Sequence, residues 1–332
     1  MTTAPVLFVG GSGFVGRAAV RWFRARHPDR PILIGGRNLE AASNLAREVG
    51  HAEAIAIDLG RPGLGLDRDI PLAAMLMLAP DNGLHGMRYA QDHGAPYLNI
   101  GNGLVEIGPE TMLYAHRAKA APIVLASHWM AGAAVFLALE AAKRFDTVQS
   151  VRIGVVFDDQ DPAGPAAMED MQRLHEAAPA TLTFQDGKRA WLSGDATQGQ
   201  VEAIDGRVLA ANAFDPLDVA SLFAATGAPN VRFDLATAES SSRRRGGEVA
   251  AEFIAEIEGT SGGKTTRARS TLEFLRGQSS LTALAVVLDL EAIMGWNGRA
   301  PIAPGLYLPE LLGDARWFLD ELRTSGATIV EG

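Results

Sequence analysis

The chain has 332 residues, of which 47% are hydrophobic and 21% charged, a composition typical of a globular protein large enough for two domains. Its formal net charge of −9 argues against nucleic acid or an anionic membrane as its main partner. The lack of cysteine excludes disulfides, thiolate nucleophiles and cysteine-ligated metals, and the spacing of the seven histidines indicates no metal site.

The first predicted element is a buried strand over residues 6–9, which leads into a glycine-rich turn and a helix. In this turn Gly11 permits a sharp bend, Gly13 lets a pyrophosphate approach the backbone, and Gly16 lets the helix pack closely. This order of elements predicts a dinucleotide site with the phosphates at the helix N-terminus. The alternative is a glycine-rich connection without a ligand. We assign to the cofactor site Gly11, Ser12, Gly13, Phe14, Val15 and Gly16.

The second predicted strand, at residues 31–34, indicates which dinucleotide binds. In NAD sites an acidic residue at the end of this strand accepts hydrogen bonds from the ribose hydroxyls. Here the strand runs into Gly35, Gly36 and Arg37, and a guanidinium suits the 2′-phosphate of NADP(H). The alternative for Arg37 is a solvated surface position. We assign to the same cofactor site Gly36, Arg37 and Asn38.

Four further strands complete the predicted nucleotide-binding domain, over residues 54–58, 73–79, 97–100 and 123–126. Helices alternate with these strands, the last of them over residues 110–121, and this alternation predicts a doubly wound parallel Rossmann sheet. Asp58, at the end of the third strand, is predicted to approach the adenine or to serve as a turn residue. Ala79 and Pro80 leave the fourth strand at the edge that faces the nicotinamide.

After residue 127 the pattern changes to that of a second α+β domain with a mostly antiparallel sheet. An alanine-rich helix over residues 132–145 begins this domain. The predicted strands cover residues 150–157, 252–258 and 264–274, with a hairpin over residues 200–211 that turns at Asp205-Gly206. The last two strands are expected to have one solvated and one buried face. The exposed edges of this sheet predict a homodimer.

The C-terminal residues return to helix, over 279–295 and 313–324, and both helices are expected to pack on the nucleotide-binding domain. The predicted domains are therefore 1–127 plus about 280–332 for the dinucleotide, and 128–279 for substrate and dimerisation. The apolar stretch 281–294 is short for a bilayer and contains two acids, so it predicts a core helix. Because the N-terminus also lacks the basic start of a signal peptide, we expect a cytoplasmic protein.

The candidate catalytic residues are His128 and Tyr97. His128 directly follows the strand at 123–126, and its imidazole is predicted to exchange an amine proton near neutral pH. The alternative is a loop histidine that only forms hydrogen bonds. Tyr97 and Asn99 are predicted to form hydrogen bonds with the substrate, with core packing as the alternative for Tyr97.

Further candidates for contact with a small-molecule substrate lie in the second domain. Trp129 is predicted to form an apolar wall beside the substrate. Arg243 and Arg244 belong to the densest basic cluster in the chain and are predicted to bind a substrate carboxylate. The alternative for this cluster is a solvated basic turn.

Several of these patches resemble the saccharopine dehydrogenase-like reductases. The resemblance rests on residues 10–16, 35–37, 78–80, 93–97, 127–132 and 303–310. The first two match the NADP-binding ends of that family, and residues 127–132 stand where the family has a Pro-Gly turn, with Ala131 in place of the proline. The resemblance implies hydride transfer between NADP(H) and a C–N bond, with a small amine or amino-acid-like substrate.

The opening turn is also found in two other classes of protein. A short-chain dehydrogenase has a similar opening turn but needs a Tyr-x-x-x-Lys pair. This chain has none, because the residues four positions after its tyrosines are His93, Gly101, Ala118 and Leu311. The remaining alternative is a non-catalytic NADP-binding regulatory or scaffold protein, which the lack of a decisive acid or base residue favours.

Overall fold

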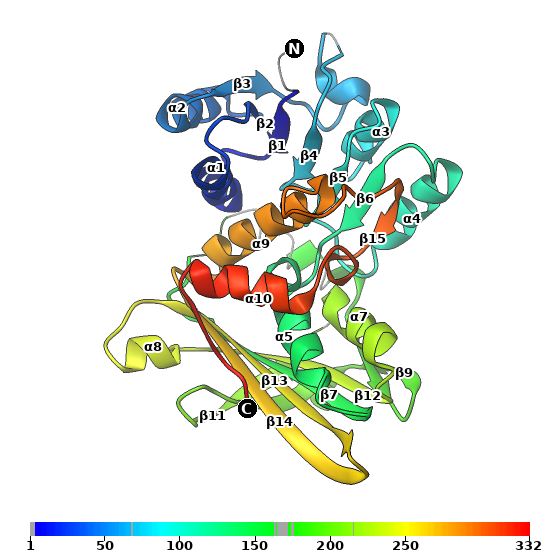
Figure 1. The fold of residues 1–332 in the computed structure, drawn as a ribbon, viewed down its shortest axis with the longest axis vertical. Helices are drawn as coiled ribbons and strands as arrows, with labels where there is room; N and C mark the ends of the chain where they lie inside the picture. Colours follow the sequence, from blue (N-terminus) through cyan, green and yellow to red (C-terminus); the bar gives the residue numbers. More distant parts are fainter. Residues whose placement is uncertain (1–3, 68, 163, 165–171, 174–175, 215) are drawn as a thin grey trace. The chain divides into compact units, whose positions relative to one another are not determined.

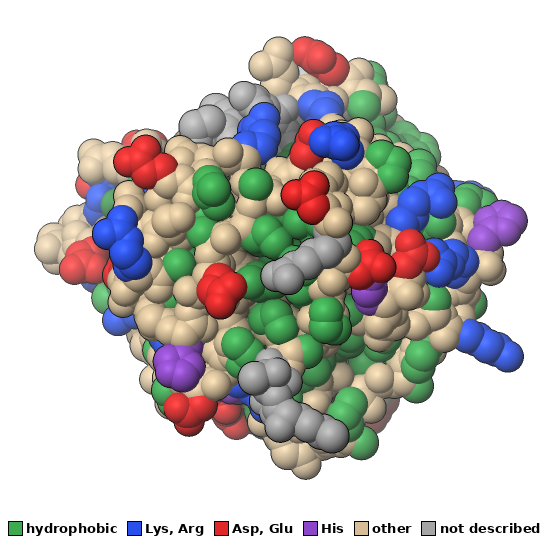
Figure 2. All heavy atoms as spheres, turned by 90° about the horizontal axis from the view of Figure 1, so that it is seen from above, with side chains coloured by type: hydrophobic (Ala, Val, Ile, Leu, Met, Phe, Trp, Pro, Cys, Tyr) green, Lys and Arg blue, Asp and Glu red, His purple; other side chains and the backbone are tan. Residues whose placement is uncertain are grey.

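The computed structural model describes residues 4–67, 69–162, 164, 172–173, 176–214 and 216–332 (Figure 1). The chain divides into two compact units. Unit 1 contains the described residues of Met1–Ser127 and Thr282–Leu312, and unit 2 contains those of His128–Pro162, Met171–Leu281 and Gly313–Gly332. On the face drawn in Figure 2, acidic, basic and hydrophobic side chains are interspersed.

Unit 1 is built on a parallel sheet in which the described strands follow the order β15-β6-β5-β4-β1-β2-β3. These strands are β1 (Val6–Val9), β2 (Ile32–Gly36), β3 (Ala52–Ala56), β4 (Ala74–Met77), β5 (Tyr97–Asn99), β6 (Pro122–Leu125) and β15 (Gly305–Tyr307). Each neighbouring pair is parallel. The order reverses between β1 and β4, which is the topological switch point where open α/β sheets bind their ligands.

Helices separate the strands of this sheet, as the alternating pattern predicts. They are α1 (Phe14–Arg26), α2 (Leu39–Val49), α3 (His85–Asp92) and α4 (Ile107–His116), with 3₁₀ turns η1 (Pro62–Gly65) and η4 (Pro309–Leu311). Because crossovers are right-handed and the chain reverses direction at β4, α1 and α2 cover one face and α3 and α4 the other. The covered strands β1 and β4 are buried throughout. The predicted doubly wound Rossmann sheet is therefore confirmed.

The bounds of some elements in unit 1 differ from the prediction. The helix expected over residues 110–121 is α4, which begins at Ile107 and ends at His116. The third strand begins and ends two residues earlier than expected. β15 lies between the two helices predicted at residues 279–295 and 313–324, and its three residues become a strand only because they pair with β6. So short a segment has no periodicity that a sequence pattern could detect.

Most of the long helix α9 (Gly277–Met294) belongs to unit 1. Among the described residues it is the one helix long and apolar enough to cross a membrane, and 72% of its apolar window is buried inside the structure. The sequence suggested a shorter helix. Its acid Glu291 accepts from both Arg26 and His27, with Nε of Arg26 at 2.6 Å and Nε2 of His27 at 2.8 Å. These contacts attach α9 to the end of α1, as expected of a core helix.

Unit 2 is built on a mixed sheet whose described strands follow the order β10-β11-β12-β7-β13-β14-β16, with β8 and β9 attached to β12. The strands are β7 (Thr147–Asp158), β8 (Thr181–Gln185), β9 (Lys188–Leu192), β10 (Gln198–Glu202), β11 (Val208–Ala213), β12 (Asn230–Ala238), β13 (Ala250–Ser261), β14 (Lys264–Leu275) and β16 (Ala327–Val330). Among these strands only the pair β7 and β12 is parallel. The predicted mostly antiparallel sheet is therefore confirmed.

The helical elements of unit 2 pack on one face of this sheet and at its ends (Figure 1). They are η2 (Trp129–Gly132), α5 (Ala133–Ala142), η3 (Gly194–Thr197), α7 (Leu217–Thr226), α8 (Ser241–Arg244) and α10 (Ala315–Thr324). α5 packs on β13 and β14, and α7 packs on β12. The predicted helix over residues 132–145 is present as α5, which begins at Ala133 because Gly132 has a positive φ, and which ends at Ala142.

The hairpin β10–β11 covers part of the other face of the sheet. Val201 packs with Val156 and Ile254 in a buried apolar cluster. A Cβ atom on Gly154 would lie only 2.8 Å from Val201, so this glycine lets the hairpin approach the sheet closely. For this reason the first half of β13 is buried on both faces, and the expected solvated face is limited to its second half.

Residues 313–332 lie in unit 2, whereas the sequence placed them with the nucleotide-binding domain. β16 pairs with β14, and α10 packs on α5. The rings of Phe136 and Phe318 stack with their centroids 4.1 Å apart. The amphipathic pattern of α10 indicates a buried face, but the pattern does not specify the element that covers it.

Candidate functional site

The glycine-rich turn after β1 bends at Gly10, one residue before the Gly11 to which the sequence assigned the sharp bend. Gly10 has a φ of +77° and donates its N–H to the carbonyl of Gly35 over 2.8 Å. A Cβ atom on Gly16 would lie 2.2 Å from the carbonyl oxygen of Gly10, so any side chain there would displace α1 from the turn. Gly13 has extended backbone, and a Cβ atom there would contact only the carbonyl oxygen of Gly10, at 3.0 Å.

The N-terminus of α1 is suited to an anion. Gly13 is the N-cap residue and provides no side-chain hydrogen bond, and the first turn contains no acidic residue. Among the described residues no side chain caps these first N–H groups, and the helix dipole favours a negative charge beside them. Gly13 and Phe14 are exposed, while Ser12 and Val15 are half-buried. The turn thus fits the pyrophosphate that the sequence predicted.

Beside this turn, the end of β2 presents a cation. Arg37 directly follows β2 and is exposed, and the described part of the chain gives its guanidinium no ion pair. The Cβ position of Gly36 lies 3.7 Å from Oγ of Ser12, so the two loops are neighbours. Asn38 instead caps α2, because its Oδ1 accepts the N–H of Ala41 over 2.9 Å. The side chain of Asn38 is therefore used within the fold.

Asp58 has the contacts of a turn residue. Its Oδ1 accepts the N–H of Gly60 over 2.9 Å, and its own N–H donates to the carbonyl of Leu64 over 2.9 Å. The side chain is exposed. Of the two roles that the sequence left open, these bonds support the turn.

The loops after β1, β4 and β5 lie against one another at the switch point. A Cβ atom on Gly10 would lie 3.2 Å from Cβ of Ala79. A Cβ atom on Gly101 would lie 3.3 Å from the carbonyl of Ala79 and from the nitrogen of Pro80. The Ala79-Pro80 segment therefore lies between two glycines, and the three loops form a continuous backbone surface that begins at the glycine-rich turn.

Tyr97 is a structural residue in this arrangement. Its ring is fully buried, and its hydroxyl donates to Oδ2 of Asp81 over 3.1 Å. The buried Asp81 also accepts the N–H groups of Gly86 and Met87 at the start of α3. Burial raises the pKa of the Tyr97 phenol well above its usual value, and the nearby Asp81 carboxylate adds to this. The core-packing alternative describes this tyrosine, and its predicted catalytic role has no support from its surroundings.

Asn99 belongs to a buried polar cluster that the sequence did not reveal. Its Nδ2 donates to Oε1 of Glu110 over 2.7 Å, and its Oδ1 accepts the N–H of Gly101 over 2.8 Å. The N–H of Asn102 donates to Oγ of Ser127 over 3.2 Å. Burial raises the pKa of Glu110 despite the hydrogen bond from Asn99. The cluster fixes the loop after β5, and it uses both polar atoms that Asn99 was predicted to offer a substrate.

The signal for Glu110 was weak. An acidic residue in the first turn of a helix usually faces solvent and complements the helix dipole. Here Glu110 is almost fully buried, with 1% of its surface exposed. The run Gly101-Asn102-Gly103 before the helix was the one available hint of a close-packed loop.

In unit 2, His128 is buried beside α7. Its ring is buried, and Nε2 lies 2.7 Å from Oγ of Ser221 in α7. Burial lowers the pKa of His128 to about 3, so its imidazole is neutral across the physiological range. The expected exchange of protons near neutral pH does not match this environment, and the hydrogen-bonding alternative does. The catalytic assignment of His128 stays a prediction.

Trp129 begins the turn that follows. The backbone N–H of Trp129 donates to Oδ2 of the buried Asp218 over 2.7 Å. The indole ring packs edge-on against Phe214 and Phe233. The apolar contacts are those expected of a wall, although no substrate contact is tested. Ala131 has a φ of +50°, which proline cannot adopt, so the backbone explains why alanine stands there.

The arginine cluster is engaged in ion pairs within unit 2. Nε of Arg243 lies 2.8 Å from Oδ2 of the buried Asp158, and the same guanidinium also contacts Asp159. Nε of Arg244 lies 2.9 Å from Oδ2 of Asp205. A substrate carboxylate would therefore compete with carboxylates of the chain itself. These contacts do not match the predicted substrate role of Arg243 and Arg244, and the pairing also differs from a purely solvated turn.

In the described part of the chain, no three histidine, aspartate or glutamate side chains gather as metal ligands would. Of the residues of unit 1 that were predicted to bind the cofactor, Ser12 lies near Gly36, and Ala79 lies near Gly10. Asn38 caps α2, and Asp58 lies in a turn after β3. In unit 2, His128 and Trp129 share one turn, and Arg243 and Arg244 lie together in α8.

A parallel sheet with this strand order and a glycine-rich turn at its switch point defines a dinucleotide-binding Rossmann fold. No family model and no curated protein matches the sequence. Saccharopine dehydrogenase (L-Glu forming) from Saccharomyces cerevisiae has a similar structure, with a TM-score of 0.69 and 14% identity over 99% of this chain and 100% of that chain.

Two further solved structures are similar. Homospermidine synthase from Legionella pneumophila, in complex with NAD, matches with a TM-score of 0.63 and 10% identity over 100% of this chain and 91% of that chain. Scyllo-inositol dehydrogenase from Lactobacillus casei matches with a TM-score of 0.51 and 11% identity, over 99% and 98% of the two chains. At such identities the likeness concerns the fold. The chain therefore has a saccharopine dehydrogenase-like fold.

Proposed function

We propose that the protein is an NADP(H)-dependent oxidoreductase that acts on a C–N bond, by imine reduction or amine oxidation, of a small amine or amino-acid-like substrate. The observation that carries the cofactor assignment is Arg37, an exposed guanidinium without an ion pair among the described residues, beside the glycine-rich turn. The fold shared with saccharopine dehydrogenase and homospermidine synthase supports an oxidoreductase. The C–N bond follows from the sequence resemblance.

Different residues of unit 1 bind different parts of the cofactor. The N–H groups at the start of α1 bind the pyrophosphate, and Gly13 keeps the backbone accessible there. Arg37, with Ser12 nearby, binds the 2′-phosphate by charge-assisted hydrogen bonds. The segment Ala79-Pro80 and Gly101 support the nicotinamide end. When bound, the cofactor supplies the hydride, while the protein supplies orientation and exclusion of water.

The cofactor assignment is tested by nucleotide binding. Arg37→Ala is expected to lower the affinity for NADPH by about 10- to 100-fold, because a charge-assisted hydrogen bond is lost. The affinity for NADH should be unchanged. The exposed Arg88 in α3 provides a matched control, Arg88→Ala, which should alter neither. Titration of reduced-nicotinamide fluorescence measures all four affinities. An equal loss of affinity for NADPH and NADH in Arg37→Ala would contradict the assignment of Arg37 to the 2′-phosphate.

The reaction is tested by turnover of NADPH with pairs of an amine and an oxo compound. The alternative, a non-catalytic NADP-binding regulatory or scaffold protein, is favoured by one set of observations. His128 is buried and neutral, and the polar atoms of Tyr97 and Asn99 are used within the fold. NADPH binding without turnover over a broad panel of amines, keto acids and aldehydes would establish this alternative.

The remaining parts of the proposal concern assembly and location. The uncovered strand edges of unit 2 support a homodimer, which sedimentation equilibrium measures directly. We further propose that the protein acts in the cytoplasm, where NADPH is available, without a membrane or nucleic-acid partner.

A further inference from the structure

Three described strands of unit 2 have a neighbour on one side only, namely β9, β10 and β16. Such an edge offers its outward N–H and C=O groups to a further strand. In antiparallel strands every second residue directs both of its backbone groups to the same side, so one set of alternate residues faces outward. The three edges differ in what covers these outward groups and in the charges beside them.

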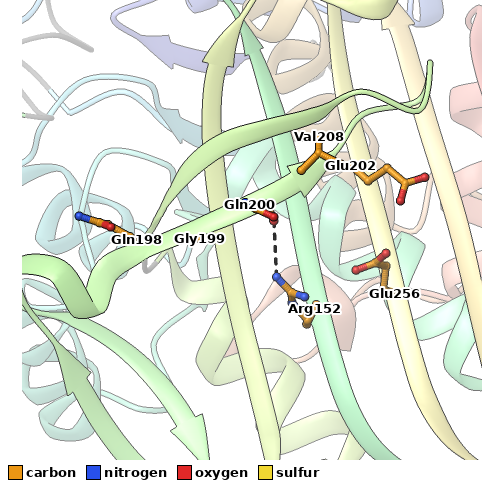
Figure 3. Close-up of a pocket in the computed structure, with 7 residues that line it drawn as sticks. All are labelled: Arg152, Gln198, Gly199, Gln200, Glu202, Val208 and Glu256. Atoms are coloured by element: carbon orange, nitrogen blue, oxygen red, sulfur yellow. Dashed lines mark hydrogen bonds between the residues drawn. The ribbon is translucent and has the colours of Figure 1, made fainter.

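The edge of β10 is covered by its own sheet. The N–H of Ala203 bonds across the hairpin to the carbonyl of Arg207, so the residues that alternate with Ala203 face outward. Each outward carbonyl accepts an arginine Nη2, in the pairs Gln198 with Arg232, Gln200 with Arg152, and Glu202 with Arg269, over 3.0, 3.5 and 2.9 Å. Figure 3 shows the contact between Arg152 and Gln200. These arginines occupy the acceptors that another strand would need.

The edge of β9 is protected by charge. Lys188 and Arg189 are both exposed on this five-residue strand. A second copy paired here would bring the same two cations to a short interface, and like charges on paired strands are unfavourable. Short edge strands with charged side chains resist pairing for this reason.

The pattern of β14 shows which groups of β16 face outward. β13 and β14 are joined by a two-residue turn, so Lys264, which follows the turn, bonds to β13, and so does every second residue after it. The residues between them, which include Thr271, bond to β16 on the other side. Because Thr271 pairs with Val330, the backbone groups of Ala327 and Ile329 point away from the sheet.

The edge of β16 has neither form of protection. Its outward groups at Ala327 and Ile329 receive no hydrogen bond from the described part of the chain. The strand contains no charge and no proline, and its last three residues are β-branched, which favours strands. Val330 is 58% exposed. A neutral, uncovered edge of this composition is suited to pairing with another strand.

The edge of β16 is also complementary to itself. Glu331, the next residue, contacts both Arg316 and Arg323 of α10, so its carboxylate is neutralised within the protomer. A second copy of the edge therefore does not repel the first. Because the antiparallel pairing of a strand with an identical strand is isologous, each outward N–H meets an outward C=O of the other copy.

We propose that β16 pairs with β16 of a second copy, antiparallel about a two-fold axis at Ile329. In this register Ala327 lies opposite Glu331 of the partner subunit, and the sheets of the two copies of unit 2 become one continuous sheet. The proposal rests on the homodimer proposed above and assigns its surface.

The test compares two substitutions of Ile329 by sedimentation equilibrium of the full-length protein. Ile329→Ala and Ile329→Pro both remove most of the side chain, but only proline removes the outward N–H. Edge strands tolerate proline where the N–H faces away from the sheet, so the monomer should keep its fold. The dimer loses one such donor from each copy, and Ile329→Pro should dimerise about 10- to 100-fold more weakly than Ile329→Ala.

A second variant does not depend on proline. Val330→Lys places a charge at an exposed position of the same edge and should also weaken the dimer. Val208→Lys, at an exposed valine of β11 in the same sheet, is the matched control and should leave the dimer unchanged. Melting curves verify that each variant is folded.

The outcomes distinguish the interface from the assembly. A natural sequence that is monomeric at all concentrations would contradict both the homodimer and its assignment to β16. If Ile329→Pro and Val330→Lys dimerise as strongly as the natural sequence, only the assignment to β16 is wrong. Neither result bears on the NADPH titrations, which concern unit 1.

Discussion

Nδ2 of Asn99 donates to Oε1 of Glu110 over 2.7 Å, and this bond connects the end of β5 to the first turn of α4. Both side chains are 1% exposed. Because the loop between them also contacts Ala79 and Pro80, the bond positions the backbone that supports the nicotinamide end of the proposed cofactor.

Glu110→Ala is expected to leave the buried amide of Asn99 without an acceptor and to cost about 1–3 kcal/mol of stability. It should lower the affinity for NADPH about tenfold. The affinity for 2′-phospho-ADP-ribose, which lacks the nicotinamide, should be unchanged. Fluorescence and calorimetric titrations measure the two ligands. Glu110→Gln keeps an acceptor oxygen and is the matched control. If Glu110→Ala lowered the affinity for both ligands equally, the loop would support the glycine-rich turn as well as the nicotinamide end.

Two glycines of the same turn should respond in opposite ways to valine. Gly16→Val places a side chain within 2.2 Å of the Gly10 carbonyl, so we expect overpacking that costs about 1–3 kcal/mol or more and a lower melting temperature. Gly13→Val places its side chain at the exposed start of α1, so the fold should persist while NADPH binding is lost. Thermal unfolding and NADPH titration are measured on both. NADPH binding by a folded Gly13→Val protein would argue against a pyrophosphate at this turn.

Because His128 is buried and neutral, we expect the stability of unit 2 to decrease at acidic pH. In the folded protein burial lowers its pKa to about 3, whereas the unfolded chain takes up the proton near 6.5. The unfolded state therefore binds more protons between these values, and stability falls as the pH decreases from 6.5 toward 3, by up to about 1.4 kcal/mol per pH unit.

This contribution is measured by urea unfolding at pH 7 and pH 5. His128→Gln removes the titrating group, so its stability should decrease less between the two values than that of the natural sequence. His116→Gln, at an exposed histidine of α4, should retain the full decrease.

If His128 serves in catalysis, His128→Gln should lower turnover more than NADPH affinity. Unchanged turnover would leave it a structural residue.

Arg243 and Arg244 distinguish a structural from a substrate role. Arg243→Ala removes the partner of the fully buried Asp158, so it should lower the melting temperature clearly. Arg244→Ala, at a side chain that is 43% exposed, should lower it little. The two melting curves are compared at the same pH and salt. A normal melting temperature for Arg243→Ala, together with a raised KM for a carboxylate substrate, would restore the predicted substrate role.

Local patterns were sufficient for the fold class and for the glycine-rich turn of unit 1. The spacing of Gly11, Gly13 and Gly16 follows from backbone geometry within a few residues, so it is visible in the sequence. The alternation of apolar strands and amphipathic helices likewise depends on neighbours along the chain. The absence of an acid before Arg37 could be observed in the same way.

The contacts of individual polar side chains depended on residues far apart in the sequence. Tyr97 bonds to Asp81, His128 to Ser221, and Arg243 to Asp158, over separations of 16, 93 and 85 residues. Such partners decide whether a tyrosine, a histidine or an arginine remains available to a ligand. No local pattern specifies them, because each depends on which elements the fold brings together.

The same reason explains the position of the helix α10. The periodicity of α10 indicates an apolar face, but only tertiary packing places that face on α5. Secondary structure and the glycine turn are local properties, whereas the availability of a charge is a property of the folded chain.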